Sequence, residues 1–237
     1  MQTKATIRRP PLLEVIVCSV SDAIEAQRGG AGRLEIIRDL QSGGLTPPLE
    51  LVQEILDVVT LPVRVMLRES DSYEVTGQDE KEKLFAHARE LSELNVNGVV
   101  LGFLSRGEID VPLTESVLSC APNLSATFHH AFEEAKDPFM AIRVIEQLKQ
   151  VDRILASGGT GPWTEKIKRL SRYEAEVDSE IEILVGGGVD QQSIGMICQS
   201  TRIREFHVGR AARKPASPEG VVSSELVKAL VATLHEH

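Results

Sequence analysis

Residues 12–17 are Leu-Leu-Glu-Val-Ile-Val, and residues 33–37 are Arg-Leu-Glu-Ile-Ile. Both runs are apolar and nearly continuous, apart from a few charged side chains. Such runs are typical of parallel strands that are buried on both faces of a sheet. Comparable runs recur along the whole chain. The expected strands cover residues 12–17, 33–37, 63–67, 98–102, 124–129, 152–156, 181–185 and 205–208.

An amphipathic stretch separates each run from the next. Several of these stretches begin at proline, which suits the first turn of a helix. The expected helices cover residues 21–28, 49–59, 79–94, 112–120, 138–149, 162–173, 191–199 and 218–234. Strands that alternate with helices in this number predict a single-domain (β/α)8 TIM-type barrel over residues 11–237, after an N-terminal tail at residues 1–10. The alternative, an open doubly wound sheet, is less favoured because the first turn, residues 18–21, contains no glycine.

Composition excludes several classes of protein. The formal net charge of −9 argues against a nucleic-acid partner, which would need a basic face. The chain contains no apolar run long enough to cross a membrane, and residues 1–11 lack the apolar segment of a secretory signal. The 3 cysteines have no paired spacing, which indicates a reduced, cytoplasmic chain.

Polar side chains interrupt the expected strands or end them. They are Glu14, Glu35, His129 and His207, with Arg68 just beyond the third strand. In a barrel the carboxyl ends of the strands carry the chemistry, so these groups are candidate acid–base or ligand-binding residues around one mouth. The alternative is that they form buried ion pairs and hydrogen bonds that only fill the barrel.

Glycine-rich turns follow the later strands. Gly186-Gly187-Gly188 follows the seventh strand, and Gly209 and Arg210 follow the eighth. Uncovered backbone N–H groups at this position of a barrel often bind phosphate, so we expect an anionic ligand here. Ser157 opens a further glycine-rich turn after the sixth strand. The alternative is that these glycines serve only to make tight turns.

Several short motifs occur in order along nearly the whole chain. They are Leu12-Leu13-Glu14, Gly29-Gly30-Ala31-Gly32-Arg33-Leu34-Glu35, Gly43-Gly44-Leu45-Thr46-Pro47, Gly98-Val99-Val100-Leu101-Gly102, Thr127-Phe128-His129, Arg153-Ile154-Leu155-Ala156-Ser157-Gly158, Gly186-Gly187-Gly188 and Glu205-Phe206-His207. Together they resemble the CutC family, which is named for copper homeostasis. The resemblance implies a (β/α)8 barrel, a cytoplasmic homo-oligomer and a role in copper homeostasis or copper binding.

The chain lacks the family's cysteines, which are the residues best suited to bind copper. The family usually carries cysteines at the positions of Ile16 and Ile37. Cys18 and Met66 are then the soft donors expected near the mouth, and they are the candidate metal ligands. Cu(I) prefers thiolate and thioether ligands, whereas arginine attracts carboxylate or phosphate. The donor set therefore favours a small anion over directly bound copper.

Three functions remain open at this point. The resemblance implies a copper homeostasis protein. The polar groups are compatible with an enzyme that performs acid–base chemistry on a phosphorylated or carboxylated metabolite. A binding protein without catalysis is the third, because the fold alone does not select a function.

Overall fold

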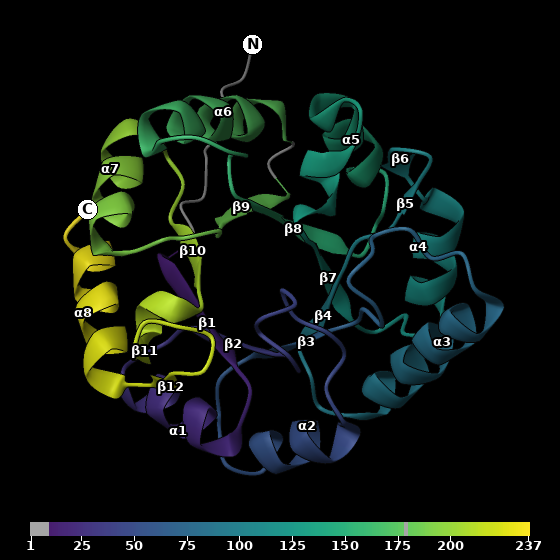
Figure 1. Ribbon diagram of the computed structural model, residues 1–237, viewed down its shortest axis with the longest axis horizontal. Coiled ribbons are helices and arrows are strands. Elements are labelled where there is room, and N and C mark those ends of the chain that lie inside the picture. Colours follow the sequence, from purple (N-terminus) through teal and green to yellow (C-terminus); the bar gives the residue numbers. More distant parts are fainter. Residues whose placement is uncertain (1–9, 178–179) are drawn as a thin grey trace.

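The computed structural model describes residues 10–177 and 180–237, and over these residues eight parallel strands close into a barrel (Figure 1). The order around the barrel is β1-β10-β9-β8-β7-β4-β3-β2. Since β1 also pairs with β10, the sheet has no edge, which confirms the predicted closed barrel and excludes the open sheet. The strands are β1 (Leu12–Val17), β2 (Arg33–Ile36), β3 (Val63–Met66), β4 (Gly98–Leu101), β7 (Ser125–Phe128), β8 (Val151–Ala156), β9 (Glu182–Val185) and β10 (Glu205–Val208).

Helices form a ring outside the strands, as Figure 1 shows. They are α1 (Val20–Arg28), α2 (Leu49–Leu56), α3 (Gln78–Glu93), α4 (Val111–Ser119), α5 (Pro138–Ile145), α6 (Trp163–Glu176), α7 (Gln191–Ser200) and α8 (Ser224–His235). The loops also contain short strands and 3-10 helices: β5 (Leu104–Ser105), β6 (Glu108–Ile109), η1 (His130–Glu134), η2 (Arg210–Ala212), β11 (Arg213–Lys214) and β12 (Val221–Val222). Each expected helix is present, although its ends differ by a few residues.

The expected start of the last helix at residue 218 is wrong. Residues 213–222 instead form a hairpin in which β11 pairs with β12. Asp22 holds this hairpin, because it accepts hydrogen bonds from the Val222 backbone at 3.0 Å and from the buried Arg213 guanidinium at 2.9 Å. Those contacts bring together residues about 200 positions apart, so local spacing could not reveal them.

The barrel interior is unusually charged. Arg33 and Arg64 are among the largest fully buried side chains. A buried charge is costly unless it is paired, and the structure pairs these groups with carboxylates, Arg33 with one on the adjoining strand β1 and Arg64 with one across the barrel on β8. Arg33 contacts Glu14, and Arg64 binds both carboxylate oxygens of Asp152 at 2.7 Å. Buried ion pairs therefore stabilise this deep layer of the barrel.

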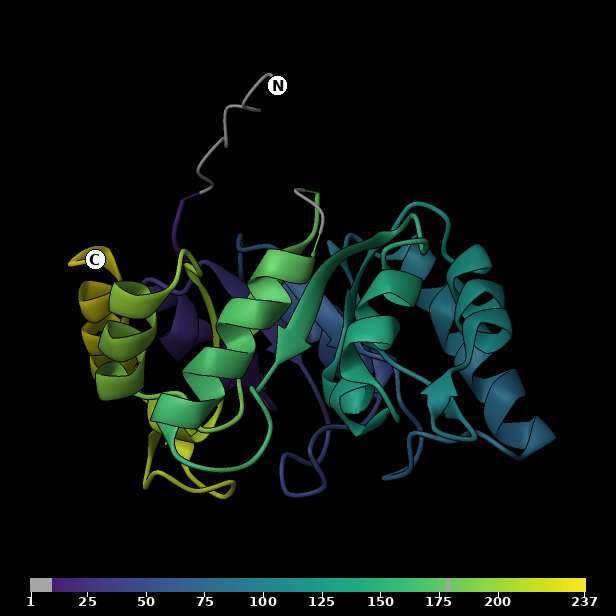
Figure 2. The same cartoon turned by 90° about the horizontal axis from the view of Figure 1, so that it is seen from above.

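The carboxyl ends of the strands form the open mouth. In Figure 2 the loops that follow β2 and β10 extend from the same end of the molecule. Of the expected tail at residues 1–10, all but Pro10 lies outside the described residues. No helix among the described residues is long and apolar enough to cross a membrane.

Candidate functional site

A cavity of about 360 Å³ opens at the barrel mouth. Its size is at the lower end of the range for small-molecule sites. The apolar part of its lining comprises Ile16, Ile37, Leu40, Met66, Leu155, Val189, Ala211 and Pro218. The polar part comprises Glu35, Gln41, Arg68, Tyr73, His129, His130, His207 and Arg210, with backbone from Gly43, Gly187, Gly188 and Gly209.

A row of three side chains from β1, β10 and β2 lies at the deep end of this cavity. Glu14 Oε1 lies 2.8 Å from His207 Nδ1, and His207 Nε2 lies 3.3 Å from Glu35 Oε2. Arg33 Nε donates to the other oxygen of Glu14. The strand register explains this contact, since Glu14 is level with both Arg33 and His207 on the adjoining strands. Glu14 is covered by these partners, whereas Glu35 and His207 reach the cavity.

The two carboxylates of this row differ in charge. Burial alone would raise the pKa of Glu14, but Arg33 and the hydrogen bond from His207 hold it well below its usual range. Burial raises the pKa of Glu35 to about 7, against the attraction of His207. The pKa of His207 is raised by the two carboxylates although burial opposes this. Glu14 is therefore a fixed anion, and Glu35 is poised to exchange a proton near neutral pH.

Glu35 also has a free atom. Its Oε1 is buried and has no hydrogen-bond partner within the described part of the chain. A buried polar atom without a partner is uncommon and costly in a folded protein. Because Glu35 lines the cavity, a bound molecule is the natural partner for this oxygen.

His129 is a different kind of group from His207. It lies at the end of β7, and its Nδ1 accepts a hydrogen bond from the Ala131 backbone at 3.3 Å. Burial lowers the pKa of His129 to about 3, so the ring is neutral at physiological pH. Its Nε2 is buried and unpartnered among the residues that the structure describes. This side chain is a poor base but can form a hydrogen bond with a ligand. Of the two roles predicted for His129, acid–base chemistry and ligand binding, the structure therefore favours ligand binding.

Arg68 lines the mouth but is largely occupied. Its guanidinium donates to the backbone oxygens of Ser42, Gly44 and Asp71 and lies 4.8 Å from the centre of the Tyr73 ring. The Tyr73 ring in turn packs against His129, with 5.1 Å between ring centroids. Tyr73 was not predicted as a site residue, because it lies in the loop after β3 and not within or at the end of a strand.

The glycine-rich turns divide into two groups. Gly187, Gly188 and Gly209 line the cavity together with Arg210, whereas Gly186 does not. A Cβ on Gly186 would come within 2.9 Å of Leu155 and 3.1 Å of His207, so this glycine allows close packing behind the site. The helix that follows is already capped, because Asp190 accepts from the Ser193 backbone at 2.8 Å. The predicted anion site therefore depends on Arg210 and loop backbone rather than on the start of α7.

Ser157 does not line the cavity. Its hydroxyl and backbone N–H both donate to Glu133 Oε2, at 2.7 and 2.8 Å. Glu133 Oε1 accepts from the backbone of Gly159. The predicted ligand role of Ser157 is thus replaced by a structural one, in which Glu133 holds the loop after β8. Glu133 was missed as a partner because contacts between separate loops leave no local pattern.

The predicted soft donors lie in one small cluster, since Cys18 packs against the group formed by Ile37, Met66 and Val100, but they do not both line the cavity. Met66 lines the cavity beside Ile16 and Ile37, but Cys18 does not line it. The Cys18 thiol lies 3.7 Å from the Arg213 guanidinium, and burial raises its pKa, which keeps it protonated. Cu(I) binds thiolate, so this arrangement does not fit it.

One further group has the spacing of a metal site. Among the described residues, the ligand atoms of Glu14, Glu35 and His207 lie within 4.8 Å of one another. These are oxygen and nitrogen donors, and the Arg33 guanidinium is bound to Glu14. A cation placed there would be repelled by that arginine and would compete with it for the carboxylate.

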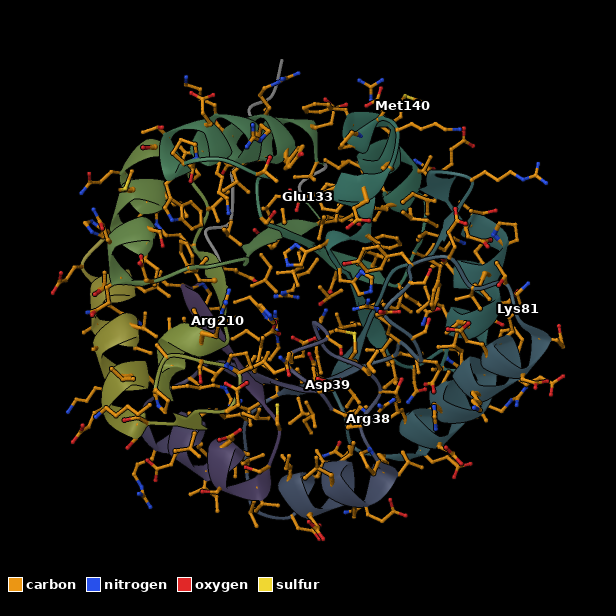
Figure 3. The ribbon with its side chains drawn as sticks, in the orientation of Figure 1. Arg38, Asp39, Lys81, Glu133, Met140 and Arg210 are labelled. Carbon is orange, nitrogen blue, oxygen red and sulfur yellow. The ribbon has the colours of Figure 1, made fainter. Side chains whose placement is uncertain are left out.

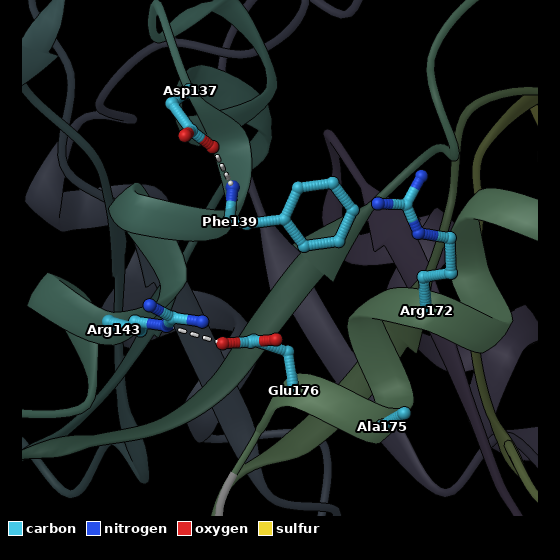
Figure 4. A pocket seen from close by; sticks show the side chains of 6 residues that line it. All are labelled: Asp137, Phe139, Arg143, Arg172, Ala175 and Glu176. Carbon is cyan, nitrogen blue, oxygen red and sulfur yellow. Dashed lines mark hydrogen bonds and ion pairs between the residues drawn. The ribbon is translucent and has the colours of Figure 1, made fainter.

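A second hollow, of about 440 Å³, lies outside the barrel between α5 and α6 (Figure 4). Its charged side chains already have partners within the protein. Arg143 donates to Glu176 at 2.5 Å, Asp137 accepts from the Phe139 backbone, and Arg172 lies over the Phe139 ring. Arg210, by contrast, lies inside the ring of helices, while Met140 on α5 lies outside it (Figure 3). The reactive groups therefore belong to the barrel mouth.

Comparison with known proteins agrees with the barrel architecture. The sequence model of the CutC family matches residues 11–212. The copper homeostasis protein cutC homolog of Homo sapiens is 32% identical over 197 residues, covering 83% of this chain and 72% of that protein. A CutC family protein of Mesorhizobium japonicum is 32% identical over 213 residues, or 90% of this chain and 82% of its own length.

Solved structures lead to the same fold. The CutC protein of Streptococcus agalactiae superposes with a TM-score of 0.77 at 27% identity, covering 84% of this chain and 98% of that one. A thiamine phosphate pyrophosphorylase from Pyrococcus furiosus has a TM-score of 0.59 at 18% identity, covering 97% of this chain and 98% of that one, and shares the fold alone.

Proposed function

The chain belongs to the CutC family, and we propose that its barrel mouth is an acid–base site for a small organic anion. The observation that carries this proposal is the buried row Glu14–His207–Glu35, which ends beside the cavity on a carboxylate oxygen without a hydrogen bond from residues 10–177 or 180–237. A carboxyl group with a pKa near neutrality can both give and take a proton at working pH.

Each group has a distinct role in this proposal. Glu14 orients His207 through Nδ1, and His207 holds the carboxyl of Glu35 in place. Glu35 exchanges the proton, while Arg210 at the rim attracts the anionic end of the ligand. A cytoplasmic homo-oligomer, as the resemblance implies, belongs to the same proposal.

Copper is the competing ligand, because the human relative is named for copper homeostasis. The donors present here do not fit Cu(I): the family's cysteine positions are Ile16 and Ile37, and Cys18 lies against Arg213. We therefore derive no step through copper. Any part that this chain plays in copper homeostasis would then be indirect, through the molecule that it binds or transforms.

A Cu(I) titration of the reduced protein tests this point. We expect weak binding that is the same in wild type and Cys18→Ser, because a protonated thiol beside an arginine is a poor ligand. The measurement is competition with a colorimetric Cu(I) chelator. Cys120→Ser is the matched control, since Cys120 is also a free cysteine but lies at the end of α4. Tight binding that is lost only in Cys18→Ser would contradict the prediction.

A thermal-shift screen of phosphorylated and carboxylated metabolites tests the proposed site. A true ligand at 100 times its Kd should stabilise the protein by about 2.7 kcal/mol, equivalent to several degrees in Tm. We expect Arg210→Gln to weaken that ligand about tenfold or more, because a charge-assisted hydrogen bond is lost. Arg143→Gln, in the outer hollow, should bind normally. The absence of any stabilising compound, or a loss confined to Arg143→Gln, would refute the proposal.

A further inference from the structure

Four residues that line the cavity have a buried polar atom without a hydrogen bond among the described residues. Nε of Arg68 and Nδ1 of His130 are two of these atoms, and the other two come from different strands. They are Oε1 of Glu35 on β2 and Nε2 of His129 after β7, both without a hydrogen bond inside the described ranges. β3 and β4 separate these strands in the barrel, so the two groups approach the cavity from different sides. An unsatisfied buried group costs about 1–3 kcal/mol, and two at one cavity indicate a ligand that satisfies both.

The geometry defines what each atom can do. His129 Nδ1 accepts the Ala131 N–H, so this nitrogen carries no proton. The proton of the neutral ring must then be on Nε2, which makes Nε2 a donor. Glu35 Oε2 faces His207, which leaves Oε1 as the oxygen that can meet the ligand. The cavity therefore presents one neutral donor and one proton-accepting carboxylate to the same molecule.

We propose that the ligand is a small carbonyl compound with a C–H bond next to the carbonyl and an anionic group at its other end. In this assignment the carbonyl oxygen accepts from His129 Nε2, and Glu35 Oε1 takes the adjacent C–H proton. Arg210 at the rim meets the anionic group. This inference rests on the proposed acid–base function and specifies its substrate class and reaction.

The step needs no further reactant. The C–H bond breaks and its proton goes to Glu35, while its electron pair forms a carbon–carbon double bond. The former carbonyl π pair moves to oxygen, and the resulting enolate oxygen is stabilised by the hydrogen bond from His129. Return of the proton by Glu35 to the same carbon, while the electron pair on the enolate oxygen re-forms the carbonyl, completes a proton exchange.

A neutral imidazole suits this role better than a charged one. The pKa of His129 is low because the ring is buried and lies near Arg68 and His130, so the ring does not protonate the substrate outright. A donor that is already oriented gains strength as negative charge develops on the oxygen. The packing of Tyr73 on the ring and the bond from Ala131 supply that orientation.

The first test needs no substrate. Nitrogen NMR of the uniformly ¹⁵N-labelled full-length protein at pH 7 reports which ring nitrogen of each histidine carries the proton. The His129 signals are identified by their loss in His129→Gln. We expect a neutral ring protonated at Nε2 alone. A ring protonated at Nδ1, or at both nitrogens, would overturn the assignment of His129 as a neutral donor.

The second test measures hydrogen–deuterium exchange of two probes, 2-oxobutanoate and dihydroxyacetone phosphate, by proton NMR in D₂O. We expect wild type to accelerate exchange of at least one probe. Glu35→Gln should reduce the rate about hundredfold or more, and His129→Leu about tenfold to hundredfold. His129→Gln should retain most of the rate, because its side-chain amide is also a donor. Glu225→Gln, on the exposed surface, is the control.

The outcomes separate the two proposals. If neither probe exchanges, the carbonyl assignment is overturned. If the metabolite screen nevertheless yields a ligand that depends on Arg210, the anion site stands without it. If His129→Gln loses as much rate as His129→Leu, packing rather than hydrogen bonding explains His129, and its role as a donor is refuted.

Discussion

Replacing Glu14 with alanine is expected to lower the free energy of unfolding by about 3–5 kcal/mol, because it removes one partner from a buried ion pair. The Arg33 guanidinium that Glu14 binds is 2% exposed, so the variant leaves its charge in the barrel without that carboxylate. Glu205 lies 3.8 Å from Arg33, too far to replace the lost contact in full. The His207 ring loses its hydrogen bond at the same time.

Urea denaturation of wild type and Glu14→Ala measures this difference directly. Glu225→Ala is the matched control: Glu225 pairs with Lys214 at 2.7 Å but is 82% exposed, so water screens this pair and its loss should destabilise the protein far less. Adding Arg33→Met to Glu14→Ala should recover part of the loss, since the unpaired charge disappears. Equal losses in the buried and exposed variants would contradict the prediction, as would a double variant that is further destabilised.

The stability of wild type relative to Glu35→Gln is expected to fall as the pH rises from about 4.5 to about 8. Burial raises the pKa of Glu35 from the ordinary 4.5 to about 7 in the folded protein. Between these two values the folded state keeps a proton that the unfolded chain has released, so the folded state is favoured at low pH. This advantage is lost as the pH passes through 7.

The difference between the two pKa values corresponds to about 3 kcal/mol, which is the largest change that this single group can produce. Urea denaturation of both proteins at several pH values from 4.5 to 8.5 measures it. Subtracting the Glu35→Gln curve removes most of the contribution of the other titrating groups. A difference that is independent of pH, or that moves in favour of wild type as the pH rises, would contradict the raised pKa.

Much of the fold could be predicted from the sequence because burial on both faces leaves a local signature. The run Leu12–Val17 is apolar on both alternating sets of positions, which is what a strand between a barrel interior and a ring of helices requires. The same signature identified Glu14 and Glu35 as candidate site residues, since a carboxylate within such an apolar run needs a partner. The start of α8 was misplaced because the hairpin before it depends on Asp22, far away in the chain.

The candidate site was predicted less completely. Glu35, His129 and His207 reach the cavity as expected, but Ser157 turns to Glu133 and Cys18 to Arg213. Spacing along a strand indicates which face a side chain occupies. It does not indicate which of several nearby groups the side chain will bind.

By itself, the sequence determined the alternation of strands and helices, the polar residues carried into the barrel, and the loss of the family's cysteines at Ile16 and Ile37. Those properties depend on residue type and local period. Only the tertiary structure decided which polar atoms have partners. Closure of the barrel joins β1 to β10, and thereby Glu14 to His207 across 193 positions, while one oxygen of Glu35 and one nitrogen of His129 have no hydrogen bond to any residue that the structure describes. Whether two groups form a hydrogen bond depends on differences in distance of a few tenths of an ångström. These distances are set only when the whole barrel has closed.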